Sequence, residues 1–413
     1  MGKAAGSSAP RRLGERVYEH VGGVPRCLPT SKGARMPVRK LVAVAAAATG
    51  LATAVALAAA PVASASPTWR PPSYLKQFHK TTTIASTVPR NGDLNPYGVW
   101  LVRDTIGRLR RGNILVSNFN NKKNLQGTGR TIVQITPSGR RTTFATINPG
   151  KLPGPCPGGV GLTTALTVLP LGWVIVGSTP SRNGTVATSG AGCLIVLNSR
   201  GQVKETFSGG GINGPWDSAV VITGQRAQLF VTNVLAGTKA ANGKVVHRGR
   251  VLRITLSCCS ASRPPVRLAT TTIGSGFPQR SDPSAFVLGT TGVGLGAHDV
   301  LYIAETLRSR INAIPRALTR RSDAGQGRVV TQGGRLNMPL GLALAPNSNI
   351  LTVNGGDGRI VETTPGGVQI FSRFLDRSGS PPGAGALFGL AVLPGRGGVY
   401  YVDDAQNTLR LLH

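Results

Sequence analysis

Acidic residues are scarce in this sequence, which has 15 Asp and Glu against 47 Lys and Arg and a formal net charge of +32 at pH 7. A surface of this charge favours solubility and attraction to polyanions. A general bias toward arginine would produce the same excess, so the composition leaves both interpretations open. Aromatic residues make up only 5% of the chain. Stacking platforms for single-stranded nucleic acid are therefore not evident, and specific nucleic-acid binding is not expected.

Histidine and cysteine are also few, at five residues each. The sequence contains no G-x-S-x-G, H-E-x-x-H or Walker motif, and no CxxC-type pair that would suggest zinc. The glycine-rich stretch at residues 292–299 is not followed by a helical pattern, so it is not interpreted as a dinucleotide loop. None of the usual catalytic signatures is therefore present, and the residues alone give no catalytic group.

Long apolar runs are absent except near the N-terminus, where basic residues precede LVAVAAAATGLATAVALAAA at 41–60. A small-x-small cleavage site ends at Ala65, so residues 1–65 are predicted to be a cleaved signal region, with Met36 as a possible true start. An uncleaved anchor is the alternative, because 20 apolar residues can span a bilayer. After cleavage no membrane span would remain, and we expect a monomer that is secreted, periplasmic or associated with the cell wall.

A sustained helical period is missing outside the signal region, and a repeated strand pattern takes its place. Val/Ile/Leu-rich runs alternate with Gly/Asn/Pro turns, which indicates β-strands. Six runs in register define a repeating unit, because each ends in a polar residue at the same point. The runs are ILVSN (114–118), VIVGS (174–178), LFVTN (229–233), LYIAE (301–305), ILTVN (350–354) and VYYVD (399–403).

Each unit divides into four predicted strands; those of the fifth unit are LGLALAP, NILTVN, GRIVETT and VQIFSRF. Repeated four-stranded sheets predict an all-β fold, a six-bladed β-propeller over residues 81–413, preceded by a linker at 66–80. The sixth unit supplies only three strands before His413. The N-terminal segment TTTIASTV (81–88) is expected to add the missing outer strand and close the ring, which would cover both terminal edges.

Three features resemble NHL repeats: the PLGLAL segment from Pro339 to Leu344, the LYIAE and VYYVD runs, and the GRI start of a third strand. The resemblance covers residues 81–413. It implies a six-bladed propeller similar in outline to the gluconolactonase/senescence-marker and strictosidine-synthase-like propellers. NHL propellers include binding platforms, lyases and hydrolases, so the resemblance points to a fold more firmly than to an activity.

The polar residues that end the second strands are expected to form a ring near the central channel. Asn and carboxylate oxygens suit calcium, and the related enzymatic propellers hold a divalent ion with such residues. The alternative is that each side chain hydrogen-bonds its own following turn. The candidate metal ligands are Asn118, Asn233, Glu305, Asn354 and Asp403, with Ser178 at the sixth position.

The loops between second and third strands are long in the first three units, at residues 119–130, 179–191 and 234–248, and very short in the others. Long loops in a compact fold are often functional or disordered. These three neighbour one another on one face and contain basic residues but no Asp or Glu. We predict a ligand-binding rim, against the alternative of mobile loops, at Lys122, Lys123, Arg130, Arg182, Lys239, Lys244, His247 and Arg248.

Four cysteines follow residue 65. Cys156 lies in the loop that leads into the second unit and Cys193 starts that unit's third strand, so both are expected on the face of the long loops. An exported protein can form disulfides, and these two residues are predicted to pair. Cys258 and Cys259 lie on the other face and are expected to form a vicinal pair or to stay reduced.

These observations favour a secreted propeller that serves as a binding or scaffold module, with an anionic polymer or another cell-envelope component as a partner. The alternative is a divalent-metal-dependent, lactonase-like hydrolase or lyase with the ion at the central channel. Such an enzyme would also need a base near the ion, and the sequence offers no convincing one. A purely structural or assembly role is a third possibility.

Overall fold

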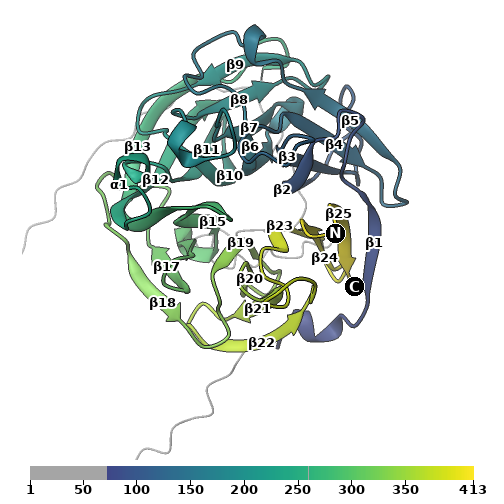
Figure 1. The fold of residues 1–413 in the computed structure, drawn as a ribbon, viewed down its shortest axis with the longest axis vertical. Coiled ribbons are helices and arrows are strands. Elements are labelled where there is room, and N and C mark those ends of the chain that lie inside the picture. Colours follow the sequence, from purple (N-terminus) through teal and green to yellow (C-terminus); the bar gives the residue numbers. More distant parts are fainter. Residues whose placement is uncertain (1–71, 259) are drawn as a thin grey trace, which may run out of the picture.

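A computed structural model describes residues 72–258 and 260–413. Its strands form six antiparallel sheets arranged in a ring (Figure 1), which confirms the prediction of a six-bladed β-propeller with four-stranded blades. The predicted signal region, residues 1–65 with Met36, lies outside the described residues. Within the described ranges no helix is long and apolar enough to cross a membrane.

In blades one to five the strands run in chain order from the central channel to the rim, and in blade six the N-terminal strand β1 is the outermost; each strand is antiparallel to the next. Blade one has β2 (Leu94–Leu101), β3 (Ile114–Asn120), β4 (Thr131–Ile135) and β5 (Arg141–Thr146). Blade two has β6 (Leu162–Val168), β7 (Val174–Ser178), β8 (Cys193–Leu197) and β9 (Val203–Phe207). Blade three has β10 (Pro215–Thr223), β11 (Arg226–Asn233), β12 (Val246–Ser257), β13 (Arg267–Asp282) and the short extra strand β14 (Phe286–Leu288).

The remaining three blades repeat this plan. Blade four has β15 (Thr290–Leu295), β16 (Leu301–Glu305), β17 (Arg310–Ile314) and β18 (Arg328–Gln332). Blade five has β19 (Pro339–Leu344), β20 (Ile350–Asn354), β21 (Arg359–Thr363) and β22 (Gln369–Phe374). Blade six has β23 (Leu387–Val392), β24 (Val399–Asp403), β25 (Thr408–Leu412) and, as its outer strand, β1 (Thr81–Ser86). The helices are single turns: η1 (Leu75–Gln77), η2 (Pro149–Lys151), η3 (Pro170–Gly172), η4 (Val186–Thr188), α1 (Thr238–Ala241) and η5 (Ala297–Asp299).

The ring closes as predicted, because β1 pairs antiparallel with the last strand, β25, from Thr81 opposite Leu412 to Ser86 opposite Thr408. The backbone NH of Lys80 also donates to the carbonyl of His413, at 2.8 Å. The two ends of the described chain therefore lie in one sheet, and neither leaves an unpaired terminal strand (Figure 1).

The segment before β1, which the sequence assigned to a linker, packs against blade five. Tyr74, Leu75 and Phe78 are buried. Buried Glu362 on β21 accepts hydrogen bonds from the Ser73 hydroxyl (2.7 Å) and from the backbone NH groups of Tyr74 (2.8 Å) and Leu75 (2.9 Å). Residues 73–86, here called the N-terminal clasp, therefore join blades five and six.

Six hydrophobic clusters form the core, and they lie between neighbouring blades and, at one end, across the channel. Adjacent inner strands approach one another closely around the ring. A Cβ at Gly389 would lie 2.1 Å from the carbonyl oxygen of Tyr97. Glycine at this position of the inner strand therefore allows adjacent blades to meet at the channel wall.

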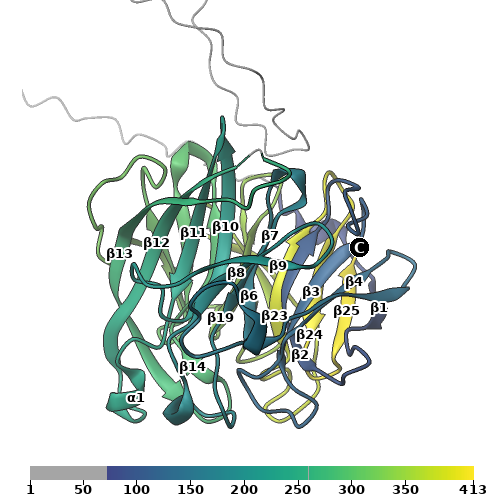
Figure 2. The ribbon, with the colours of Figure 1, turned by 90° about the horizontal axis from the view of Figure 1, so that it is seen from above.

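Blade three departs from the plan, because β12 and β13 extend beyond the blade as an arm. Val246 pairs with Gln279 and Gly249 with Phe277, with bulges along the ladder, and β13 then pairs with β14. Figure 2 shows α1 and β14 at the same face of the ring. We call this face, where the loops between second and third strands lie, the loop face.

The predicted disulfide between Cys156 and Cys193 is present, with the two Cα atoms 5.2 Å apart. Cys193 is fully buried at the start of β8, and Cys156 is in the loop that leads into blade two. The bridge therefore ties that loop to the third strand of its own blade. Cys259 lies outside the described residues, and the prediction about Cys258 and Cys259 is left untested.

Candidate functional site

The polar residues that end the second strands lie at equivalent, buried positions at the loop face, but each is bound within its own surroundings. Glu305 is completely buried and accepts hydrogen bonds from Arg308 and Arg310 and from the side-chain amide of Asn312. Its oxygens lie 2.5 Å from Arg308 Nε and 2.9 Å from Arg310 Nε. Two arginines therefore already neutralise this carboxylate.

Asp403 is bound in the same manner. Its Oδ2 lies 2.9 Å from Arg410 Nη1, and its Oδ1 accepts the backbone NH of Gln406, at 3.2 Å. Burial raises the pKa of Asp403, and the hydrogen bond from Arg410 opposes that shift. The two charged members of the ring are thus paired with arginines of their own blades.

The asparagines of the ring are held by backbone groups. Asn118 Nδ2 donates to the carbonyl of Thr87 at 3.1 Å, and Asn354 Nδ2 to that of Arg335 at 2.8 Å. Asn233 Oδ1 accepts the backbone NH of Asn213 at 3.2 Å. In the described ranges, no group of three or more His, Cys, Asp or Glu side chains could hold a metal ion. The two carboxylates of the ring are paired with arginines, whereas the buried Oδ1 atoms of Asn118 and Asn354 have no hydrogen-bond partner among the described residues, so the calcium set stays a prediction.

Aromatic side chains fill the channel at the loop face. The ring of Tyr97 stacks on those of Phe119 and Phe388, with centroids 4.6 and 4.0 Å apart, and meets Trp216 edge-on at 5.4 Å. Phe286, the first residue of β14, contacts Phe119 with ring centroids 5.6 Å apart. All five side chains are buried in one cluster. An apolar plug thus fills the channel beside the polar residues that end the second strands.

The long loops of blades one to three pack on one another above this plug. Gln126 Nε2 donates to the carbonyls of Pro283 (3.3 Å) and Ser284 (3.1 Å), which lie between β13 and β14. The backbone NH of Ser181 donates to Gly127 at 2.8 Å, which joins the loops of blades two and one. These loops and the β13–β14 hairpin form one layer, the cap, and contacts between its members hold it in place.

Two carboxyls near the plug have raised pKa values and were not identified from the sequence: Asp404, and Asp217, which follows Trp216 on β10. Asp404 follows the ring residue of blade six, and its backbone NH donates to Ala386 at 2.7 Å. Burial, and secondarily the nearby charge of Asp403, raises its pKa to about 7. Its charge in turn adds to burial in raising the pKa of Tyr97. Asp404 is only partly exposed.

All the side chains of the predicted basic rim are exposed on the cap. In the described part of the chain none of them forms an ion pair; the ion pairs there involve Arg280, Arg308, Arg310, Arg359 and Arg410. The nearby acids are engaged elsewhere: Asp93 is buried and accepts Thr131 Oγ1, and Asp282 pairs with Arg280 at 3.0 Å. The rim therefore presents unneutralised positive charge to solvent.

One boundary of the rim differs from the prediction. The third strand of blade three, β12, begins at Val246, so His247 and Arg248 belong to that strand rather than to a loop. The reason is the extended arm, in which β12 gains partners on β13 that the repeat pattern does not contain. The loop proper is shorter and includes α1.

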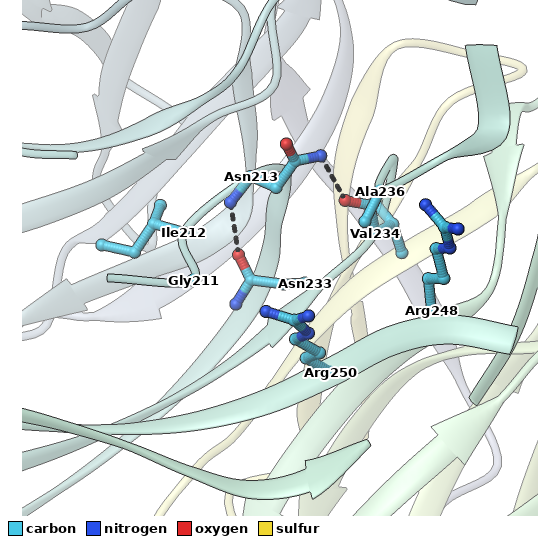
Figure 3. Close-up of a pocket in the computed structure, with 8 residues that line it drawn as sticks. All are labelled: Gly211, Ile212, Asn213, Asn233, Val234, Ala236, Arg248 and Arg250. Atoms are coloured by element: carbon cyan, nitrogen blue, oxygen red, sulfur yellow. Dashed lines mark hydrogen bonds between the residues drawn. The ribbon is translucent and has the colours of Figure 1, made fainter. Parts of the chain in front are cut away.

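A pocket of about 190 Å³ opens beside the rim, between the loop that leads into blade three and the adjoining ends of β11 and β12. Arg248 and Arg250 of β12 line one side, and Asn213 and Asn233 line another (Figure 3). The sequence analysis identified Arg248 but not Arg250 or Asn213. The alternation R-G-R at 248–250 was a usable signal for paired arginines, whereas the approach of Asn213 depends on the neighbouring blade.

No protein-family model matches this chain, and no curated protein matches it. Among solved structures, a gluconolactonase from Xanthomonas campestris is 11% identical with a TM-score of 0.47, over 80% of this chain and 88% of that one. Virginiamycin B lyase from Staphylococcus aureus is 14% identical with a TM-score of 0.46, over 81% and 98%. Aldose sugar dehydrogenase from Streptomyces coelicolor is 14% identical with a TM-score of 0.47, over 81% and 98%. At these identities and scores the activities of the three proteins carry no weight for this chain.

Proposed function

We propose that this chain is an exported, NHL-like propeller that binds an anionic polymer of the cell envelope through the basic rim of its cap. The observation that supports this most directly is the concentration of eight exposed basic residues, without an ion-pair partner among the described residues, on three adjoining loops and the start of β12. A polymer of repeated negative charge could contact several of them at once.

The order within the cap also supports this function. Gln126 and Ser181 take part in hydrogen bonds between its segments, so the cations are carried on loops that support one another. A preformed surface loses less conformational freedom on binding than separate flexible loops would. The ordered cap is therefore better suited to binding a polymer than a set of independent mobile loops would be.

The alternative hydrolase or lyase would require a divalent ion at the channel. Glu305 and Asp403 are paired with arginines, and the aromatic plug fills the channel beside them. Asp404 and Asp217, the latter next to Trp216 of the plug, have pKa values of about 7 that would suit proton transfer, yet neither lines either of the two pockets on the faces of the ring. The geometry thus favours binding over metal-dependent hydrolysis.

The test is retention on an anionic resin such as heparin or a teichoic-acid-like polymer. We expect replacement of four rim lysines by Gln to weaken binding, by roughly 30-fold if each exposed contact contributes about 0.5 kcal/mol. Binding should also fall with salt, because the Debye length shrinks from about 10 Å at 0.1 M to about 3 Å at 1 M. The replaced residues are Lys122, Lys123, Lys239 and Lys244.

A matched control removes equal charge from exposed arginines on the opposite face that make no side-chain hydrogen bonds in the described residues: Arg103, Arg111, Arg200 and Arg321. Arg108 is left out, since its guanidinium donates to the carbonyls of Thr143 and Phe144 and its loss would disturb blade one. The proposal requires the rim variant to elute at clearly lower salt than the control. Equal elution of the two variants would show that net charge alone drives retention.

A further inference from the structure

The pocket beside Arg248 and Arg250 has the features of a site for one anionic group. Figure 3 shows both side chains extending from the start of β12, with Asn233 beside Arg250 on the paired strand β11 and Asn213 hydrogen-bonded to Asn233. The lining contains two guanidinium groups and no acidic residue. In the described part of the chain neither arginine has an ion-pair partner, so both charges are available to a ligand.

The two asparagines of the pocket, Asn213 and Asn233, are held in place by hydrogen bonds before any ligand binds. The backbone NH of Asn213 donates to Asn233 Oδ1 at 3.2 Å, and Asn213 Nδ2 donates to the carbonyl of Val234 at 3.3 Å. Asn233 Nδ2 donates to Val231 at 3.3 Å. Each amide NH₂ has a second hydrogen that these bonds do not use. The pocket wall therefore offers oriented neutral donors in addition to the two cations.

Two glycines keep the pocket open next to the guanidinium groups. A Cβ at Gly237 would lie 3.0 Å from Arg248 Cδ and 3.3 Å from its Nη1, and a Cβ at Gly211 would lie 3.9 Å from Arg250 Nη1. Both glycines have positive φ, 79° and 92°, which other residues rarely adopt. A side chain at Gly237 would therefore crowd Arg248, whereas one at Gly211 would reach ordinary contact distance of Arg250.

We infer that this pocket binds a tetrahedral oxyanion, a phosphate or sulfate ester group of the polymer, as the anchoring subsite of the basic rim. This inference rests on the proposed function and specifies its ligand chemistry. The planar guanidinium group can donate two parallel hydrogen bonds to one oxyanion, which an ammonium group cannot do. Two such groups in one pocket can together contact several oxygens of a tetrahedral group, while the surrounding lysines attract the rest of the chain.

The experiment replaces both arginines by lysine, R248K/R250K, which keeps the net charge and removes the guanidinium geometry. Fluorescence anisotropy would measure binding of labelled polyphosphate, heparin and polyglutamate of matched charge at 0.15 M salt. We expect the wild type to bind the phosphate and sulfate polymers at least about tenfold more tightly than polyglutamate. The double variant should lose about tenfold in affinity for those two polymers and little for polyglutamate.

The opposite face supplies a matched control. A pocket of about 160 Å³ there is lined by Arg316, Arg320 and Arg321, so R320K/R321K makes the same chemical change beside a cavity of similar size. We expect this variant to bind all three polymers like the wild type. Unchanged circular dichroism and melting temperature would show that both double variants are folded.

The possible outcomes separate this inference from the proposed function. If the wild type binds none of the polymers, the proposed function and the subsite both fail. If it binds them and R248K/R250K binds equally well, the rim acts through charge alone and only the subsite is refuted. If the control variant loses as much as R248K/R250K, guanidinium groups contribute equally on both faces, and the subsite is refuted as a specific site. Equal loss for polyglutamate would refute the tetrahedral specificity. Loss for only one of phosphate or sulfate supports the subsite and identifies its ligand.

Discussion

Closure of the ring by the N-terminal clasp predicts that the protein depends on residues that precede its first blade. Deleting residues 66–86 would remove β1 and expose the open edge of β25. It would also remove buried Tyr74, Leu75 and Phe78. Burial of such side chains contributes about 1.5–3 kcal/mol each, so the apolar loss alone is about 5–9 kcal/mol as an upper bound.

That loss is comparable with the whole stability of an ordinary domain, about 5–15 kcal/mol.

A milder variant tests the hydrogen bonds of the clasp without removing the edge strand β1. Glu362→Gln keeps the shape of the side chain but replaces one acceptor oxygen by a donor that faces Ser73 Oγ or the NH groups of Tyr74 and Leu75. Hydrogen bonds to a charged group contribute about 1.5–3 kcal/mol each, so the loss of one or two costs about 2–6 kcal/mol.

The assay is denaturant unfolding of the wild type, Glu362→Gln and the truncated chain, with Arg140→Gln as an exposed surface control. We expect the truncated chain to be the least stable, Glu362→Gln to be intermediate, and the control to match the wild type. A truncated chain as stable as the wild type would refute the closure. If only Glu362→Gln matched the wild type, the hydrogen bonds of the clasp would be shown to contribute little.

Three further predictions concern the disulfide, a buried carboxyl and calcium. Replacing Cys156 and Cys193 by Ser should cost about 4 kcal/mol in denaturant unfolding, because their sequence separation is 37 residues; a loss below 1 kcal/mol would contradict this. Burial raises the pKa of Asp217 from 3.8 to about 7. The folded state therefore favours the protonated form, and this group's contribution to stability falls by about 4 kcal/mol as pH rises from about 4 to about 7. The melting temperature of Asp217→Asn should accordingly fall less than that of the wild type between pH 5 and pH 8; parallel curves would refute the assignment. Millimolar calcium should leave the melting temperature unchanged, because Glu305 and Asp403 are paired with arginines; a rise of several degrees would show a site that this geometry does not explain.

The architecture was predictable from the sequence because a propeller repeats one local pattern. The strand alternation and the common polar ending of each second strand predict the blades, and the three-strand last unit predicts closure by residues 81–88. The pairing of Cys156 with Cys193 followed from placing both on one blade. Each of these inferences needed only the order of strands within a unit, which the sequence contains.

The channel and the cap could not be predicted in the same way, since they depend on contacts between blades. Trp216 and Phe388 are distant in sequence and meet only when the ring closes. The polar ring was placed near the channel by the symmetry of the repeat, and symmetry does not show which neighbours bind each side chain. The arginines that bind Glu305 and Asp403 lie five and seven residues later on the following strand, so a search for charge pairs across that turn could have found them.

Hydrogen exchange followed by mass spectrometry, with and without a phosphate- or sulfate-bearing polymer, tests most directly the claim that the cap is the binding surface. Bound polymer should slow exchange in the loops and strand start at residues 119–130, 179–191 and 234–250, because contacts there would restrict local opening. The opposite-face loops at 103–112 and 316–327, which are also rich in arginine, should exchange as they do in the free protein. Protection confined to the cap is the result that this account predicts, and protection of the opposite face alone or of both faces equally would contradict it.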